Sequence, residues 1–261
     1  MYDRLREVLA QPIVRQASHP WSPRGLLDRL AEAHQVCAHI CQERNNGLIP
    51  LCLSGGLDST TSLGLLTRLV PKDSIHTFTI CQGPEHADGV FSRLAAEHFG
   101  VRHTLLMPTQ EQIQQMQLEL PKASLGAIAT RLLYHHLSEV GVHGVIAHDG
   151  IDELLGGYWL HRVTPEVAFP DYWHRLEPEH LAVLLLIAKE TGIEPVFPYL
   201  QWDVVEVITS IPFNQRTSRE CSKMPLREIA REVGVPATII ERQKIGLCDV
   251  LTLDERTRAT I

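Results

Sequence analysis

A run of small and hydroxylated residues interrupts an apolar stretch early in the chain. The segment "PLCLSGGLDSTTSLGLL" covers residues 50–66; its start has the pattern of a strand and its end that of a helix. Glycines allow the backbone to approach a ligand closely, and backbone amides that precede a helix bind anionic oxygens. The segment therefore predicts a phosphate-binding loop, with candidate contacts from Ser54, Gly55, Gly56, Asp58, Ser59 and Thr60.

Two alternatives would each explain part of this segment. A simple N-capped helix would explain Asp58 or Ser59 together with one glycine, but not the whole set. A Walker A loop does not fit, because no G-K-[ST] follows the glycines. Asp58 would repel phosphate unless a divalent cation lay between them, so the loop also predicts a metal ion.

A second acidic loop follows another apolar stretch, in "VIAHDGIDELLGGY" at residues 145–158. Its predicted strand delivers Asp149, Asp152 and Glu153 to one turn. Two acidic loops at neighbouring strand ends can hold Mg²⁺ on oxygen ligands, with phosphates completing the coordination shell. The alternative is a set of solvated acids near a helix start, favoured by the helix dipole.

Strand-like and helix-like segments alternate over the part of the chain that holds both loops. Strands are predicted at 47–53, 74–80, 101–107 and 143–150, and helices at 24–45, 58–70, 87–100 and 124–141. This alternation predicts an α/β fold with a parallel sheet covered on both faces, and no further strand after Asp149. We expect one domain over 1–261, with N-terminal helices (1–46), a parallel α/β core (47–157) and a helical C-terminal part (158–261).

The motifs resemble those of a known enzyme family. SGGLDS resembles the pyrophosphate-binding loop of enzymes that cleave ATP between the α- and β-phosphates, and residues 145–158 resemble the asparagine synthetase pattern "vLsGeGaDElfgGY". The segments "GIEPVFPYLQWDVVEVITSIP", "SKMPLREIA" and "PATIIERQKIGL" continue the likeness. Over residues 30 to 250, the chain is similar to the synthetase domain of asparagine and β-lactam synthetases. The resemblance implies a Rossmann-like, HUP-type ATP pyrophosphatase domain.

The same resemblance implies the cofactors and the residues that bind them. ATP and Mg²⁺ are expected, with Asp58 and Asp152 as the metal carboxylates and Lys223 near the pyrophosphate. The adenine is expected along residues 77–80, which places Thr79 among the nucleotide-binding residues.

The implied reaction adenylates a substrate carboxylate and couples it to an amine, releasing AMP and pyrophosphate. Lys244 is expected to neutralise charge at the α-phosphate or the tetrahedral intermediate, and Asp149 and Glu194 are candidate bases. Asp149 stands where asparagine synthetases usually carry Glu and β-lactam synthetases Tyr, which indicates a changed substrate. Lactam closure or small-molecule amide formation in specialised metabolism, such as antibiotic biosynthesis, fits this departure.

The sequence is also compatible with other functions and bears on the nitrogen donor. Residue 2 is Tyr2 rather than a cysteine, and little chain precedes the loop, so we expect ammonia or an amine rather than glutamine as nitrogen donor. An ammonia-dependent asparagine-synthetase-like enzyme and an inactive nucleotide-binding scaffold are the alternatives. Modification of tRNA is disfavoured by the acidity of the chain.

Composition and charge exclude several classes of protein. The formal charge of −7 argues against nucleic-acid binding, and no apolar run is long enough for a membrane helix. Six scattered cysteines and a charged N-terminus indicate a cytoplasmic protein, and the fourteen histidines show no metal-ligand spacing. We expect small-molecule carboxylate and amine substrates as partners, and a homo-oligomer is compatible with the sequence.

Overall fold

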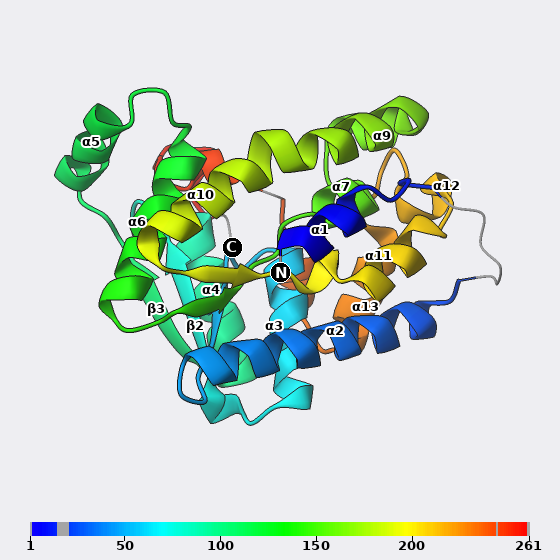
Figure 1. The fold of residues 1–261 in the computed structure, drawn as a ribbon, viewed down its shortest axis with the longest axis horizontal. Helices are drawn as coiled ribbons and strands as arrows, with labels where there is room; N and C mark the ends of the chain where they lie inside the picture. Colours follow the sequence, from blue (N-terminus) through cyan, green and yellow to red (C-terminus); the bar gives the residue numbers. More distant parts are fainter. Residues whose placement is uncertain (1, 15–20, 244, 260–261) are drawn as a thin grey trace.

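The computed structural model describes residues 2–14, 21–243 and 245–259 and contains a five-stranded parallel sheet (Figure 1). The strand order is β3-β2-β1-β4-β5, and every neighbouring pair is parallel. The strands are β1 (Ile49–Cys52), β2 (Ile75–Ile80), β3 (Arg102–Leu106), β4 (Gly144–Ile146) and β5 (Glu194–Val196). The predicted α/β class and the four predicted strands are confirmed.

The fifth strand corrects the expectation that no strand follows Asp149. Its three residues are too few to show alternation, and Pro195 at its centre lowers the strand propensity of the sequence. The strand forms because it pairs with β4 in the register Gly144↔Glu194, and the backbone of Ala147 donates to Val196 at 3.0 Å. Long-range pairing, rather than local sequence, therefore creates β5.

Helices cover both faces of the sheet. The α-helices are α1 (Tyr2–Leu9), α2 (Pro23–Arg44), α3 (Leu57–Leu69), α4 (Ala87–Phe99), α5 (Gln110–Glu119), α6 (Leu125–Glu139), α7 (Ile151–Leu155), α8 (Trp159–Val163), α9 (Pro165–Arg175), α10 (Ala182–Thr191), α11 (Trp202–Thr209), α12 (Phe213–Arg216), α13 (Met224–Glu232) and α14 (Ala237–Ile240). A π-helical turn, η2 (Leu176–Leu181), joins α9 to α10, and three 3-10 turns are η1 (Lys72–Ser74), η3 (Pro198–Leu200) and η4 (Leu247–Asp249). Every helix in these described ranges is too short or too polar to cross a bilayer.

The order of the strands explains how the helices are distributed. The connections through α3 and α4 run from β1 outward to β3, and the chain then returns through α6 to β4 on the other side of β1. Because such crossovers are right-handed, the reversal puts α3 and α4 on one face and α6 on the other. Helix α10 packs beside α6, as Figure 1 shows. Ligands of such sheets bind where the strand order reverses, here between the carboxyl ends of β1 and β4.

The C-terminal segment returns to the sheet at the end of β2. The backbone of Gln82 donates to Val250 at 2.9 Å, and the backbone of Ala87 donates to Thr257 at 2.8 Å. Turn η4, which precedes these contacts, packs on α6. The last part of the described chain thus lies beside the strand ends where the site is expected.

Candidate active site

The loop between β1 and α3 is held together by its own hydroxyls. The hydroxyls of Ser54 and Ser59 lie 3.1 Å apart, and the Ser59 hydroxyl also accepts from the backbone of Ser54 at 3.2 Å. Helix α3 begins after Gly56 without a side-chain cap, so the simple capping role weighed for Asp58 and Ser59 is not what the structure shows. Helix capping therefore does not explain why Asp58 and Ser59 stand at these positions.

Gly55 is required by two features of the same loop. Its φ of +67° lies in the left-handed region, and a Cβ there would sit 2.3 Å from the backbone carbon of Phe91. No side chain fits that gap, because the atoms in the way belong to the backbone of α4. The first glycine therefore lets the loop pass directly over α4.

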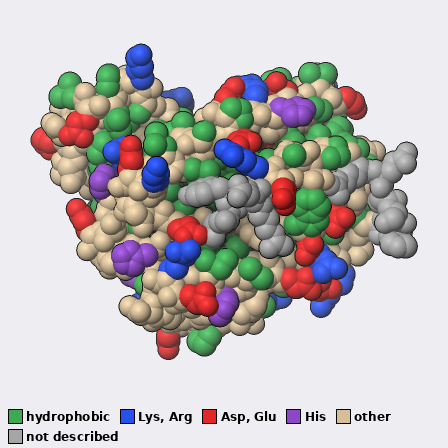
Figure 2. Space-filling view, in the orientation of Figure 1, with side chains coloured by type: hydrophobic (Ala, Val, Ile, Leu, Met, Phe, Trp, Pro, Cys, Tyr) green, Lys and Arg blue, Asp and Glu red, His purple; other side chains and the backbone are tan. Residues whose placement is uncertain are grey.

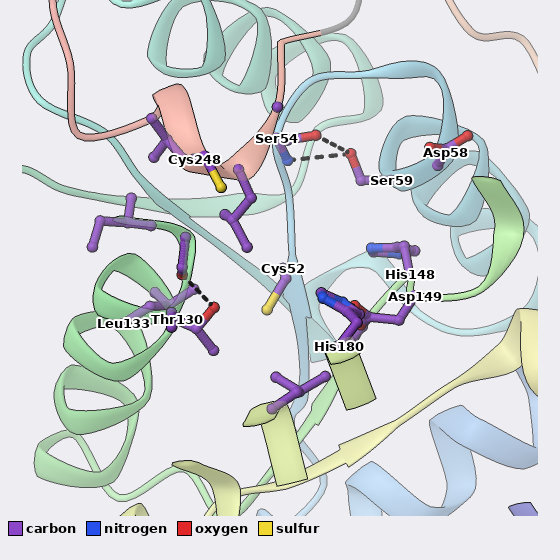
Figure 3. Close-up of a pocket in the computed structure, with 18 of the residues that line it drawn as sticks. Cys52, Ser54, Asp58, Ser59, Thr130, Leu133, His148, Asp149, His180 and Cys248 are labelled. Atoms are coloured by element: carbon purple, nitrogen blue, oxygen red, sulfur yellow. Dashed lines mark hydrogen bonds and ion pairs between the residues drawn. The ribbon is translucent and has the colours of Figure 1, made fainter. Parts of the chain in front are cut away.

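A cavity of about 540 Å³ opens at the carboxyl ends of β1 and β4, within the usual size of a small-molecule site (Figure 3). Six residues predicted from sequence line it: Ser54, Asp58, Ser59, Thr79, Asp149 and Asp152. Gly55, Gly56, Thr60 and Lys223 lie next to these residues without lining the cavity. The structure thus brings the two predicted loops to one site.

Lys223 links the two acidic loops. Its Nζ lies 2.6 Å from Asp58 Oδ2 and 2.8 Å from Asp152 Oδ1, and its side chain is only 5% exposed. Burial opposes the charge, yet the carboxylates of Asp152 and Asp58 raise the pKa of Lys223 above its ordinary value. The lysine is therefore a fixed positive charge between two carboxylates.

The backbone of Lys223 is held in an uncommon conformation. Its φ of +54° is left-handed, which is rare for a residue with a long side chain, and it immediately precedes α13. Its amide donates to Leu155 at the end of α7 at 3.2 Å, next to the second acidic loop. Such strain persists where the surrounding structure fixes a functional side chain.

A histidine that the sequence analysis did not single out completes the second acidic loop. His180, from turn η2, lines the cavity and hydrogen-bonds through Nε2 to Asp149 Oδ1, and Figure 3 shows the two side chains together. The hydrogen bond to Asp149 raises the pKa of His180 to about 8, although partial burial opposes the shift. No spacing rule could have found this pair, because its members belong to separate elements.

Two further residues of this loop region contact the same cavity. Tyr158 donates its hydroxyl to Glu153 Oε1 at 2.8 Å. Burial, followed by the charge of Asp152, raises the pKa of Glu153. Beside them, burial lowers the pKa of His148 to about 3, so this ring is neutral.

The wall of the cavity between the helices is mainly apolar, with Ser124 and Thr130 as polar exceptions. It comes from α6, α10 and the segment at η4, and its members include Ala127, Leu133, Val183, Leu184, Ile187, Ile245 and Leu247. The cavity thus has a charged side at the strand ends and an apolar side between helices.

Arg242 ties the C-terminal segment to the loop between β1 and α3. Its Nη1 donates to the Ser54 carbonyl at 2.9 Å, and its other nitrogen pairs with Asp88. The guanidinium also lies 4.8 Å from the ring centre of Phe91. Ile245, Gly246 and Leu247, which lie a few residues further along the chain, line the cavity.

One predicted residue lies away from the cavity, one is buried in the helix after the loop, and one falls outside the described residues. Glu194 starts β5, at the opposite end of the strand from the site, and pairs with Arg44, so its location does not support a role as base. Thr60 is fully buried inside α3. Lys244 lies outside the described residues, although Ile245 lines the cavity.

On the face of the molecule shown in Figure 2, the described residues form no large region of a single charge. Figure 2 shows acidic and basic side chains interspersed over the face in view. Within the described ranges, no group of three or more His, Cys, Asp or Glu side chains could hold a metal ion. A cation at this site would need further ligands from a bound molecule or from water.

Comparison with known proteins identifies the family. A family model described as asparagine synthase matches residues 42–190 and 172–258. An NH₃-dependent NAD⁺ synthetase of Pyrococcus horikoshii is 23% identical over 242 residues, which cover 83% of this chain and 89% of that protein. The solved NMN synthetase of Francisella tularensis shares the fold, with a TM-score of 0.50 and 13% identity over 88% of this chain and 78% of its own. The chain belongs to the asparagine synthase family and is an ATP-dependent ligase that forms C–N bonds.

Proposed function

We propose that the enzyme adenylates a small-molecule carboxylate with ATP and then transfers the acyl group to an amine, releasing pyrophosphate and AMP. The observation that carries this proposal is the Lys223 bridge between Asp58 and Asp152. It joins the loop after β1 to the loop after β4 at the place where the strand order reverses. Intact carboxylates and a buried lysine at this place also favour catalysis over a scaffold role.

ATP is proposed to bind along the ends of β1 and β2. Phe78, Thr79 and Ile80 line the cavity beside the Ser54–Ser59 loop, so an adenine against β2 would direct its phosphates to the loop. The Thr79 hydroxyl already donates to the carbonyl of Leu53, which leaves the backbone and the wall to contact the base. Lys223 would then attract the pyrophosphate as it leaves.

Mg²⁺ fits the same carboxylates. Asp58 Oδ1 is buried and has no hydrogen-bond partner among the described residues, whereas its Oδ2 contacts Lys223. A buried carboxylate oxygen without a partner is costly, and a hard cation would satisfy it. Asp58 and Asp152 would hold the ion, which supplies neutralisation of the phosphate charge when bound.

The two sides of the cavity suggest where the two organic substrates lie. Asp149, Asp152 and Glu153 make the side near β4 acidic, which attracts an amine in its positive form. The apolar wall between α6 and α10 suits the carbon skeleton of the carboxylate. Ammonia, named as the nitrogen donor of the related NAD⁺ synthetase, is the smallest such amine.

Product analysis tests the proposal. The purified chain is incubated with ATP, Mg²⁺ and ammonia, with aspartate, the nicotinic-acid form of NAD⁺, or amino acids that can close a lactam. We expect AMP, pyrophosphate and a new amide in equal amounts, detected by chromatography and mass spectrometry. A lactam formed without ammonia would identify an intramolecular amine. ADP and inorganic phosphate as the main products would contradict adenylation.

A further inference from the structure

The amide-forming step needs a proton acceptor inside the cavity. The acidic side attracts the amine as an ammonium ion, and that ion has no lone pair with which to attack. Its proton must therefore leave after binding. The histidines and carboxylates that line this side of the cavity are His148, Asp149, Asp152, Glu153, Glu179 and His180. Burial lowers the pKa of His148 to about 3, which is too low for a base at neutral pH.

The carboxylates are less suited to this task than the histidine. Asp58 and Asp152 both contact Lys223, and Glu153 accepts a hydrogen bond from Tyr158. Asp149 accepts a hydrogen bond from His180 on Oδ1, so it already stabilises the protonated form of that histidine. Each of these carboxylates is committed to a neighbour on the protein.

His180 has one ring nitrogen fixed and the other available. Nε2 is bonded to Asp149, so the neutral ring carries its proton there and its lone pair on Nδ1. Among the described residues, Nδ1 has no hydrogen-bond partner. The side chain is 48% exposed, and the residue lines the cavity. The π-helical turn η2 carries this residue, and such turns occur often at functional sites.

We propose that His180 is the general base of the amide-forming step and that Asp149 orients it. This proposal rests on the proposed function and changes the role expected of Asp149 from base to positioning residue. An aspartate that holds a histidine by one nitrogen, so that the other can take a proton, is a recurrent arrangement in enzymes.

The step balances without any further reactant. His180 Nδ1 takes one proton from the bound ammonium ion, and the resulting amine attacks the acyl carbon. The C–N bond forms, and the C–O bond to AMP breaks with its electron pair passing to the AMP phosphate. The second proton leaves the nitrogen for the phosphate or water.

The charges around His180 set the pH at which this base works. Asp149 bonds to it, Glu153 and Asp152 from α7 act on it through space, and Glu179 beside it is paired with Arg175. The base must be neutral, so the amide-forming rate should rise with pH through about 8. Asp149→Asn removes the main cause of the raised pKa, so the rise should move toward the ordinary histidine range near 6.5.

The experiment separates the two half-reactions in His180→Gln. Exchange of labelled pyrophosphate into ATP, with the carboxylate that the wild-type enzyme uses, reports adenylation without any amine. Amide formation is then measured with ammonia and with hydroxylamine, which is largely uncharged at neutral pH and needs no base to free its lone pair. His174→Gln, an exposed histidine on α9 outside the cavity lining, is the matched control.

We expect His180→Gln to lose on the order of 10² in the ammonia-dependent rate, while hydroxylamine restores most of it. The pH profile of Asp149→Asn should shift as stated, which a purely structural role would not produce. An ammonia-dependent rate in His180→Gln that matches the wild type overturns the base assignment alone. An equal loss with both nucleophiles also overturns it. Absence of exchange and amide in the wild type, with every carboxylate, overturns the proposed function itself.

Discussion

Replacing Lys223 by methionine would remove the positive charge between two carboxylates while keeping an unbranched side chain only one atom shorter. The lysine is 5% exposed, and its Nζ contacts Asp58 and Asp152 at 2.6 and 2.8 Å. Those carboxylates are 20% and 17% exposed, so water can solvate them only in part. Breaking a buried ion pair by removing one partner costs about 3–5 kcal/mol. For a chain of this size, that corresponds to a fall of about 6–20 °C in melting temperature.

Mg²⁺ should reverse part of this loss, because a divalent ion can replace the ammonium group between the carboxylates. Thermal unfolding is followed by circular dichroism, with and without Mg²⁺, in wild type, Lys223→Met and the control Lys189→Met. Lys189 is exposed on α10, so its variant should unfold near the wild-type temperature. A loss below about 1 kcal/mol in Lys223→Met would equal that of an exposed pair and refute the reasoning. A variant that Mg²⁺ stabilises no more than wild type would contradict the shared site.

Four other substitutions test the remaining parts of the site. Asp58→Asn and Asp152→Asn should each cost several kcal/mol of transition-state stabilisation in Mg²⁺-dependent ATP use. If either variant keeps the wild-type rate at limiting Mg²⁺, the residue that it replaces is not a metal ligand. Lys244→Ala should lower kcat on the order of 10² with little change in the Kd for ATP, and a near-normal kcat in a folded variant would place this lysine outside the chemistry. Gly55→Ala and the control Gly47→Ala both place an alanine at a left-handed φ, but only at Gly55 would the added Cβ also clash with α4. In urea unfolding, Gly55→Ala should therefore lose about 1–3 kcal/mol more free energy of unfolding than Gly47→Ala. Equal losses in the two variants would contradict the close approach to α4.

Local patterns in the sequence predicted the core of the fold well. The runs that became β1 to β4 are apolar and bounded by turn residues, so they are recognisable without their partners. The helix after β2 ends at Gly100, whose φ of +68° shows why glycine stands there. Strand β5 could not be predicted in the same way, since its three residues become a strand only beside β4.

In the candidate site too, residues in one local motif could be predicted from the sequence, whereas residues whose role depends on tertiary contacts could not. The phosphate loop is contiguous, so residue types and spacing were enough to find Ser54, Asp58 and Ser59. Glu194 looked equally suitable as an acid near a family motif, but the direction of β5 places it at the far edge of the sheet. His180 carried no signal at all, because its chemistry depends on a contact with Asp149 across 31 residues. Residue spacing along the sequence does not predict a catalytic pair that forms only when two distant segments come into contact.

The contacts of Arg242 with the loop after β1 and with Asp88 have a consequence for how the protein folds during its synthesis. The phosphate loop leaves the ribosome early, whereas the arginine that holds the Ser54 carbonyl and Asp88 is synthesised 188 and 154 residues later. Contacts of such long range form late, because the entropy of closing the loop must be overcome first. During synthesis the cavity therefore remains open on one side until Arg242 and the segment around η4 have emerged. A nascent chain that lacks them would already carry the loop between β1 and α3, but without the wall that completes the cavity.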